Sequence, residues 1–194
     1  MGKNKINLRF GVISGIILFA AISRLIPHPV NFAPIGGMAL FGAAYYNKKY
    51  WALIIPVLSM WLSDLIVNNV VYGQYFDHFV WFYQGCYWTY SAFVLITLVG
   101  FFILRQIKVI NLLAATLSAS LIFYLVSNFG VWFSTEMYPK NMAGLMACYG
   151  AGLPFLKNTL LGDMAYTSIL FATFEYAQRS IPALQLQGVK NQLG

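Results

Sequence analysis

Charged residues are scarce in this sequence. They make up 9% of its 194 residues, whereas hydrophobic residues make up 60%. A soluble domain carries about a quarter charged residues, because water must solvate its surface. This chain has too few charges for that, so lipid is the solvent expected around most of it. At about 20 residues per crossing, six crossings would use most of the length and leave no separate soluble domain.

Acidic residues, cysteines and catalytic motifs are also scarce or missing. The five acidic residues face 12 Lys and Arg, but the basic residues form short clusters between apolar runs, which is typical of membrane topology and not of nucleic-acid binding. Cys86 and Cys148 lack metal-ligand spacing, so no metal or cofactor is expected; a disulfide between them stays open. There is no GxSxG, HExxH or Gly-Lys-Ser/Thr phosphate-loop motif, so no catalytic residue is predicted. Because no phosphate-loop motif for ATP is present, a transporter with this sequence would take its energy from a partner protein or from a gradient.

The apolar runs predict an all-α integral membrane bundle of six transmembrane helices in one domain, 1–194. The first run is expected to be retained and not cleaved as a signal peptide, because Arg24 and Pro27 follow it without a small-residue cleavage site. Residues 141–155 are apolar but short and rich in glycine, so they are expected to form an interfacial or re-entrant helix. The predicted spans are 8–26, 31–46, 51–67, 86–104, 109–133 and 159–178, followed by a polar cytoplasmic tail at 179–194.

Basic residues predict the orientation of these spans. Cytoplasmic loops of membrane proteins carry an excess of Lys and Arg. If the N-terminus lies in the cytoplasm, the outer segments hold only Lys140 and Lys157. The cytoplasmic side then holds Lys3, Lys5, Arg9, Lys48, Lys49, Arg105, Lys108, Arg179 and Lys190. Both termini are therefore expected in the cytoplasm.

Polar side chains within or beside the spans gather toward their outer ends. Arg24, Asp64 and Asp163 lie inside predicted spans, where a charge is costly and faces a partner or a water-filled cavity. We expect an ion-paired floor, with Arg24 paired to Asp64 or to Asp163, beneath an outward cavity for a small-molecule solute. A structural network that only pins the helices together is the alternative. The predicted substrate-binding residues are Arg24, His28, Asn31, Asp64, Asn68, Asn128, Asn158 and Asp163.

The first span carries a GxxxG motif from Gly11 to Gly15. Glycines at this spacing let a second helix approach closely. That helix could belong to a partner protein or to a neighbouring span of the same chain, and both interpretations stay open.

Several segments resemble an uncharacterised family of bacterial membrane proteins. They are RLIPHPVNFAPIGGMALFGA from Arg24, LSDL from Leu62, SNFGVW from Ser127, MYPK from Met137 and LKNTLLGD from Leu156. That family is similar to the S components, the substrate-binding subunits of energy-coupling-factor vitamin transporters. The resemblance implies a multi-pass protein of the bacterial cytoplasmic (inner) membrane that captures a vitamin-like solute at the outer face. It also implies an ATP-driven energy-coupling module that docks on the first helix at Gly11 and Gly15, where S components tend to carry alanines.

The resemblance extends to solitary S components that bind cobalamin, in which a pocket cysteine contacts cobalt. Cys86, at the outer start of the fourth span, is placed for that role, with His28 as a second candidate. Two other functions stay open beside transport. One is a membrane-embedded enzyme that uses Asp64, Asp163 and His28 as acid–base groups, and the other is a structural membrane protein without a ligand.

Overall fold

The computed structural model describes residues 2–185 and shows six α-helices, with no strand among those residues. Part of the predicted tail, 186–194 with Lys190, lies outside the described residues. The all-α prediction is confirmed for the described chain. The helices are α1 (Gly2–Ile22), α2 (Ile35–Tyr45), α3 (Lys49–Ile66), α4 (Cys86–Ile103), α5 (Val109–Ser134) and α6 (Met142–Ser180).

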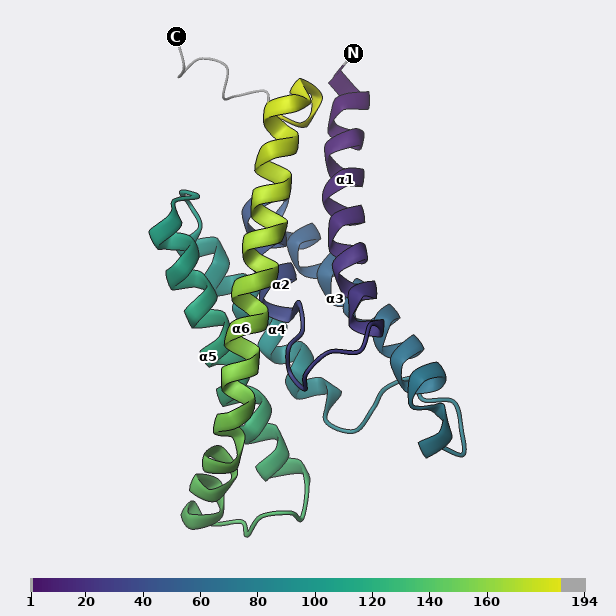
Figure 1. Ribbon diagram of the computed structural model, residues 1–194, viewed down its shortest axis with the longest axis vertical. Coiled ribbons are helices and arrows are strands. Elements are labelled where there is room, and N and C mark those ends of the chain that lie inside the picture. The colour runs from purple at the N-terminus through teal and green to yellow at the C-terminus, as the bar shows by residue number, and fades with distance from the viewer. Residues whose placement is uncertain (1, 186–194) are drawn as a thin grey trace.

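Successive helices run in opposite directions, so the loops gather at two ends (Figure 1). The start of α1 and the end of α6 lie at one end together with the turns 46–48 and 104–108, and we call this the terminal end. The opposite end carries the connections 26–34, 67–85 and 135–141, and we call it the loop end. The basic turns and the polar connections of the sequence therefore lie at opposite ends of one bundle.

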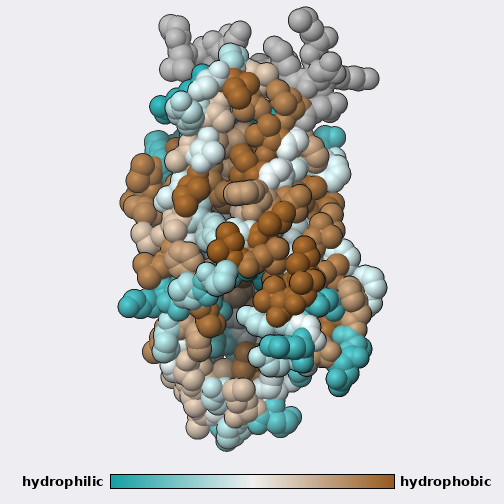
Figure 2. Space-filling model, turned by 45° about the vertical axis from the view of Figure 1, so that its right-hand side comes forward, coloured by the Kyte–Doolittle hydropathy of each residue, from teal (hydrophilic) through white to brown (hydrophobic). Residues whose placement is uncertain are grey.

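Four helical segments are long and apolar enough to cross a membrane. Mean hydropathy reaches 1.7 to 2.1 along them, and many of their large apolar side chains, such as Phe19 and Leu121, are exposed. Figure 2 shows hydrophobic side chains across the middle of one face of the bundle. The segments are Leu8–Leu25, Lys49–Val71, Cys86–Ile103 and Val109–Ser134.

Helix α2 is the short central helix of the bundle. It has 11 residues, and all of them from Ile35 to Gly42 are buried. A helix that is apolar all round belongs in an interior, and α2 packs against each of the other five helices. Its glycines allow this closeness, since a Cβ on Gly37 would lie 3.0 Å from Tyr166 of α6. The predicted span 31–46 begins too early, because Pro34 is the N-cap of α2 and residues 31–34 form a turn.

Helix α6 corrects the prediction of a separate helix at 141–155. It is one continuous helix of 39 residues that includes Pro154 and the predicted span 159–178. Glycines were interpreted as signs of a break, but Gly144 and Gly152 instead bring α6 against Pro139 and Asn128, with no room for a Cβ. Pro154 lies on the exposed side and removes one backbone hydrogen bond without ending the helix.

Candidate functional site

A buried ion pair joins three segments near the loop end. Arg24 lies in the turn Ser23–Leu25 that follows α1, and its Nη1 donates to Asp64 Oδ1 of α3 at 2.7 Å. The same nitrogen contacts Ser63 Oγ at 2.5 Å and Met60 Sδ at 3.1 Å. Tyr90 of α4 donates its hydroxyl to Asp64 Oδ2 at 2.8 Å. Asp64 is 4% exposed, so its charge is held by Arg24 and Tyr90 and not by water.

Asp163 does not join this pair, so a floor of three paired charges is not what the structure shows. Its Oδ1 accepts the backbone N–H of Gly36 at 2.9 Å, and its Oδ2 accepts Ser120 Oγ at 2.7 Å. Gly36 lies in the first turn of α2, where backbone N–H groups have no partner within the helix. The N-cap residue, Pro34, has no side-chain acceptor to offer them. Asp163 of α6 therefore caps α2 from outside.

Two adjoining cavities lie at the loop end, and the larger has Arg24 of the ion pair in its wall. The larger, of about 520 Å³, is lined by the connection 26–34, the end of α3 and the connection 67–85, and it includes Arg24, His28 and Asn31. The smaller, of about 360 Å³, lies between α5 and the first half of α6. Both have in their walls Val30, Asn31, Thr89 and Phe123. We call these two spaces the loop-end cavities.

A family model matches residues 4–184, nearly the whole chain. The chain belongs to DUF6580, a family of unknown function. No curated protein matches it, and no solved structure does. Membership of DUF6580 agrees with the expected resemblance to an uncharacterised family, while the similarity to S components stays a prediction.

The loop-end cavities of this DUF6580 chain contain only some of the predicted site residues. Arg24, His28 and Asn31 line the larger one, and Asn31 and Asn128 line the smaller one. Asn158 does not line a cavity itself, but its Nδ2 donates to the carbonyl of Val30, a residue of both cavity walls, at 3.0 Å. Besides Asn158, the predicted residues that line neither cavity are Asp64, Asn68, Cys86 and Asp163.

The two cysteines are free and lie in different surroundings. Cys86 is fully buried and contacts neither cavity, whereas Cys148 lines the smaller one and donates its thiol to the carbonyl of Asn128 at 3.3 Å. The disulfide that the sequence left open is not formed.

Several wall residues were missed from the sequence. Thr89 and Phe123 look like ordinary span residues, and Tyr83 is one of many aromatic residues in the connection 67–85. Burial raises the pKa of Tyr83 from 10.0 to about 12, so its hydroxyl stays a hydrogen-bond donor even in alkaline solution. Asn69 links this loop to α3, because its Nδ2 donates to the carbonyls of Leu65 in α3 and of Val80, and its Oδ1 accepts the N–H of Val80.

The GxxxG face of α1 packs against nothing within the described chain. Gly11 and Gly15 are exposed, and a Cβ on either would meet no atom within 4 Å. Internal packing of this motif, one of its two interpretations, is therefore absent from the structure.

Proposed function

We propose that this chain is an integral membrane protein that captures a small organic solute at its loop end, as the solute-binding part of a transport system. The observation that carries the proposal is the pair of loop-end cavities beside the Arg24–Asp64 ion pair. Each cavity lies in the size range of about 300–1,000 Å³ that is usual for small-molecule sites. Their walls combine aromatic and aliphatic surface with a few polar groups, as such sites do.

Arg24 suggests what the solute carries. Among the described residues, its hydrogen bonds all run through Nη1, which leaves Nη2 and Nε for a solute acceptor. Asp64 already balances its charge, so we propose a solute with a carboxylate or carbonyl oxygen near this arginine. The hydroxyls of Tyr83 and Thr89 add further polar contacts on the same walls.

The membrane assignment rests on the exterior of the bundle. Four segments are long enough to cross, and their exposed apolar side chains suit lipid better than water. The basic turns lie at the terminal end, so we place that end in the cytoplasm and the loop-end cavities at the outer face of a bacterial inner membrane. The exposed face of α1 at Gly11 and Gly15 has room for an energy-coupling module, the partner that the S-component resemblance implies.

The enzyme alternative gains nothing from the geometry. Of its three proposed acid–base groups, only His28 lines a cavity, while Asp64 and Asp163 are held by other protein groups. Cobalamin as the solute depended on Cys86, which is buried away from both cavities, so His28 is left as its one candidate contact. We therefore propose a small solute without naming cobalamin.

The proposal can be tested by mass spectrometry of gently solubilised protein. A small molecule should copurify with the wild-type chain. Thr89→Val, which removes a hydroxyl shared by both cavity walls, should weaken its binding roughly threefold to tenfold, the effect of about one hydrogen bond. Thr173→Val is the matched control, because Thr173 is exposed on α6 and lines neither cavity. Equal binding by both variants, or no copurified molecule, would overturn the proposal.

A further inference from the structure

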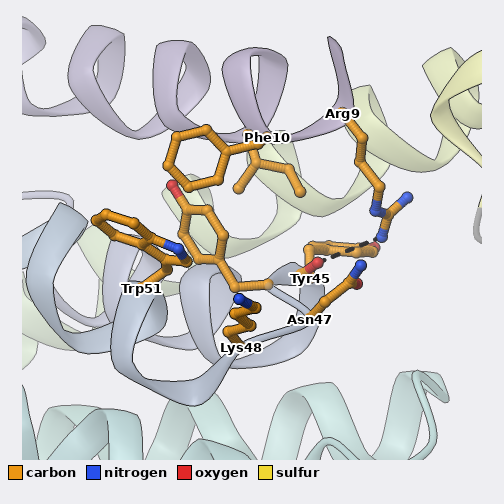
Figure 3. Close-up of a pocket in the computed structure, with 8 residues that line it drawn as sticks. Arg9, Phe10, Tyr45, Asn47, Lys48 and Trp51 are labelled. Atoms are coloured by element: carbon orange, nitrogen blue, oxygen red, sulfur yellow. Dashed lines mark hydrogen bonds between the residues drawn. The ribbon is translucent and has the colours of Figure 1, made fainter. Parts of the chain in front are cut away.

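A second kind of pocket lies at the terminal end, far from the loop-end cavities along α1. It has a volume of about 400 Å³ and lies between α1 and the turn that joins α2 to α3. Its lining includes two basic side chains and no acidic one, and Figure 3 labels Arg9, Phe10, Tyr45, Asn47, Lys48 and Trp51. We call it the terminal-end pocket.

Arg9 is a buried cation whose direct partners are all neutral. It is 6% exposed, and its Nη1 donates to Gln178 Oε1 at 2.6 Å and to the carbonyl of Leu184. Its Nη2 reaches the carbonyl of Tyr45 at 3.4 Å, and its Nε has no partner among the described residues. A buried charge without a counter-charge is costly, so this guanidinium is suited to an anion that enters the pocket.

One acid is near Arg9 but does not supply that counter-charge directly. Glu175 accepts the hydroxyl of Tyr45 at 2.6 Å and the amide of Gln178 at 3.2 Å. It forms no ion pair with Arg9 and is not part of the pocket lining. Among the described residues that line the pocket, Arg9 and Lys48 are therefore the only charged ones, and no acidic side chain balances them there.

The two ends of the pocket differ in chemistry. In Figure 3, Arg9 and Asn47 lie at one end, while Phe10 and Trp51 lie at the other. The rings of Phe10 and Trp51 pack edge to face, 5.2 Å apart. An occupant that fits both ends carries an anion on one side and hydrocarbon on the other.

We propose that the terminal-end pocket binds the phosphate group of an anionic phospholipid from the adjacent leaflet. Arg9 and Lys48 contact the phosphate oxygens, and Phe10 and Trp51 pack against the glycerol and the first methylene groups. Basic pockets between helices on the cytoplasmic side of membrane proteins bind lipid head groups in this way. The site depends on the membrane location but not on the solute proposed for the loop-end cavities.

Lys48 is the residue to change, because Arg9 also fastens Gln178 and Leu184 and its loss could unfold the chain. Purified protein is titrated with phosphatidylglycerol and with phosphatidylcholine, and bound lipid is counted by native mass spectrometry. Phosphatidylglycerol should bind more tightly, and Lys48→Gln should weaken it about fivefold. Lys49→Gln is the matched control: both lysines lie over an aromatic ring, Lys48 over Tyr50 and Lys49 over Phe101, but only Lys48 lines the pocket.

Each other outcome counts against the proposal. Equal binding of the two lipids would show that the phosphate of an anionic lipid is not selected. An equal loss in the two lysine variants would show general surface attraction and not a site. Glycerol 3-phosphate or inorganic phosphate that displaced the lipid at equal affinity would show a soluble anion as the true occupant.

Discussion

At the scale of single residues, the two buried carboxylates of the bundle have different roles. Asp64 is paired with a cation that lines a cavity, so its charge helps to hold Arg24 in place in the cavity wall. Asp163 accepts only neutral donors, Gly36 N–H and Ser120 Oγ, and is 1% exposed. A carboxylate at a helix N-terminus is favourable, because the positive end of the helix dipole lies there. Asp163 is therefore a structural link between α2, α5 and α6.

This difference predicts the behaviour of Asp163→Ala. The change leaves the N–H of Gly36 and the hydroxyl of Ser120 without an acceptor, so the free energy of unfolding should fall by about 1–3 kcal/mol. Ser120→Ala removes only one of the two donors and should cost less. Thermal unfolding in detergent measures both variants, and the folded Asp163→Ala fraction should retain the copurified solute. Loss of solute without loss of stability would instead make Asp163 a binding residue.

At the scale of helices, glycine positions determine how closely the elements approach. Gly162 of α6 lies against the backbone of the connection 26–34, and a Cβ there would be 3.0 Å from the nitrogen of Ala33 and 3.1 Å from Cα of Phe32. Gly150 of the same helix faces open space. The two glycines look alike in the sequence but have opposite surroundings.

Alanine at these two positions should therefore have opposite effects. Gly150→Ala should be neutral or stabilising by up to about 1 kcal/mol, because alanine favours a helix. Gly162→Ala should destabilise the chain and weaken solute binding, because the displaced connection carries Val30 and Asn31 of the cavity walls. Unfolding midpoints and copurified solute, measured side by side, check both effects. Similar results for the two variants would show that the contact at Gly162 does not position the connection.

The ends of the helices were predictable from the sequence where polar turns flank them. They were less predictable where packing against other helices determines where a helix ends. Helices α4 and α5 lie within a residue of the predicted spans 86–104 and 109–133, because basic turns and polar loops flank them. The prediction wrongly divided α6 into two helices. The sequence alone does not distinguish a glycine that breaks a helix from a glycine that allows a close helix contact.

The site was predictable only in part for a related reason. Charges inside apolar spans stand out, so Arg24 and Asp64 were both found. Which acid faces Arg24 depends on the rotation of α3 and α6, and hydropathy carries no such information. Thr89 and Phe123 gain their place in the cavity walls only when α4 and α5 meet the connection 26–34.

At the scale of the whole molecule, the two ends of the bundle differ in chemistry. The loop end has the cavities with the Arg24–Asp64 pair, and the terminal end has basic turns and the pocket around Arg9. The proposed solute capture and the proposed lipid contact are thus separated along the bundle axis. Which end faces the cytoplasm decides whether the proposed transport is uptake.

Cysteine labelling in intact cells can determine that orientation. Cys86 and Cys148 are buried at 0% and 2% exposure, so they should add little background. With a membrane-impermeant maleimide, Gln74→Cys and Glu136→Cys at the loop end should react from outside, since both positions are exposed. Lys49→Cys at the terminal end should react only after the cells are lysed, because positive turns stay in the cytoplasm. Labelling of Lys49→Cys in intact cells would show that the molecule has the opposite orientation. The loop-end cavities would then open toward the cytoplasm, and the proposed uptake from outside would be wrong.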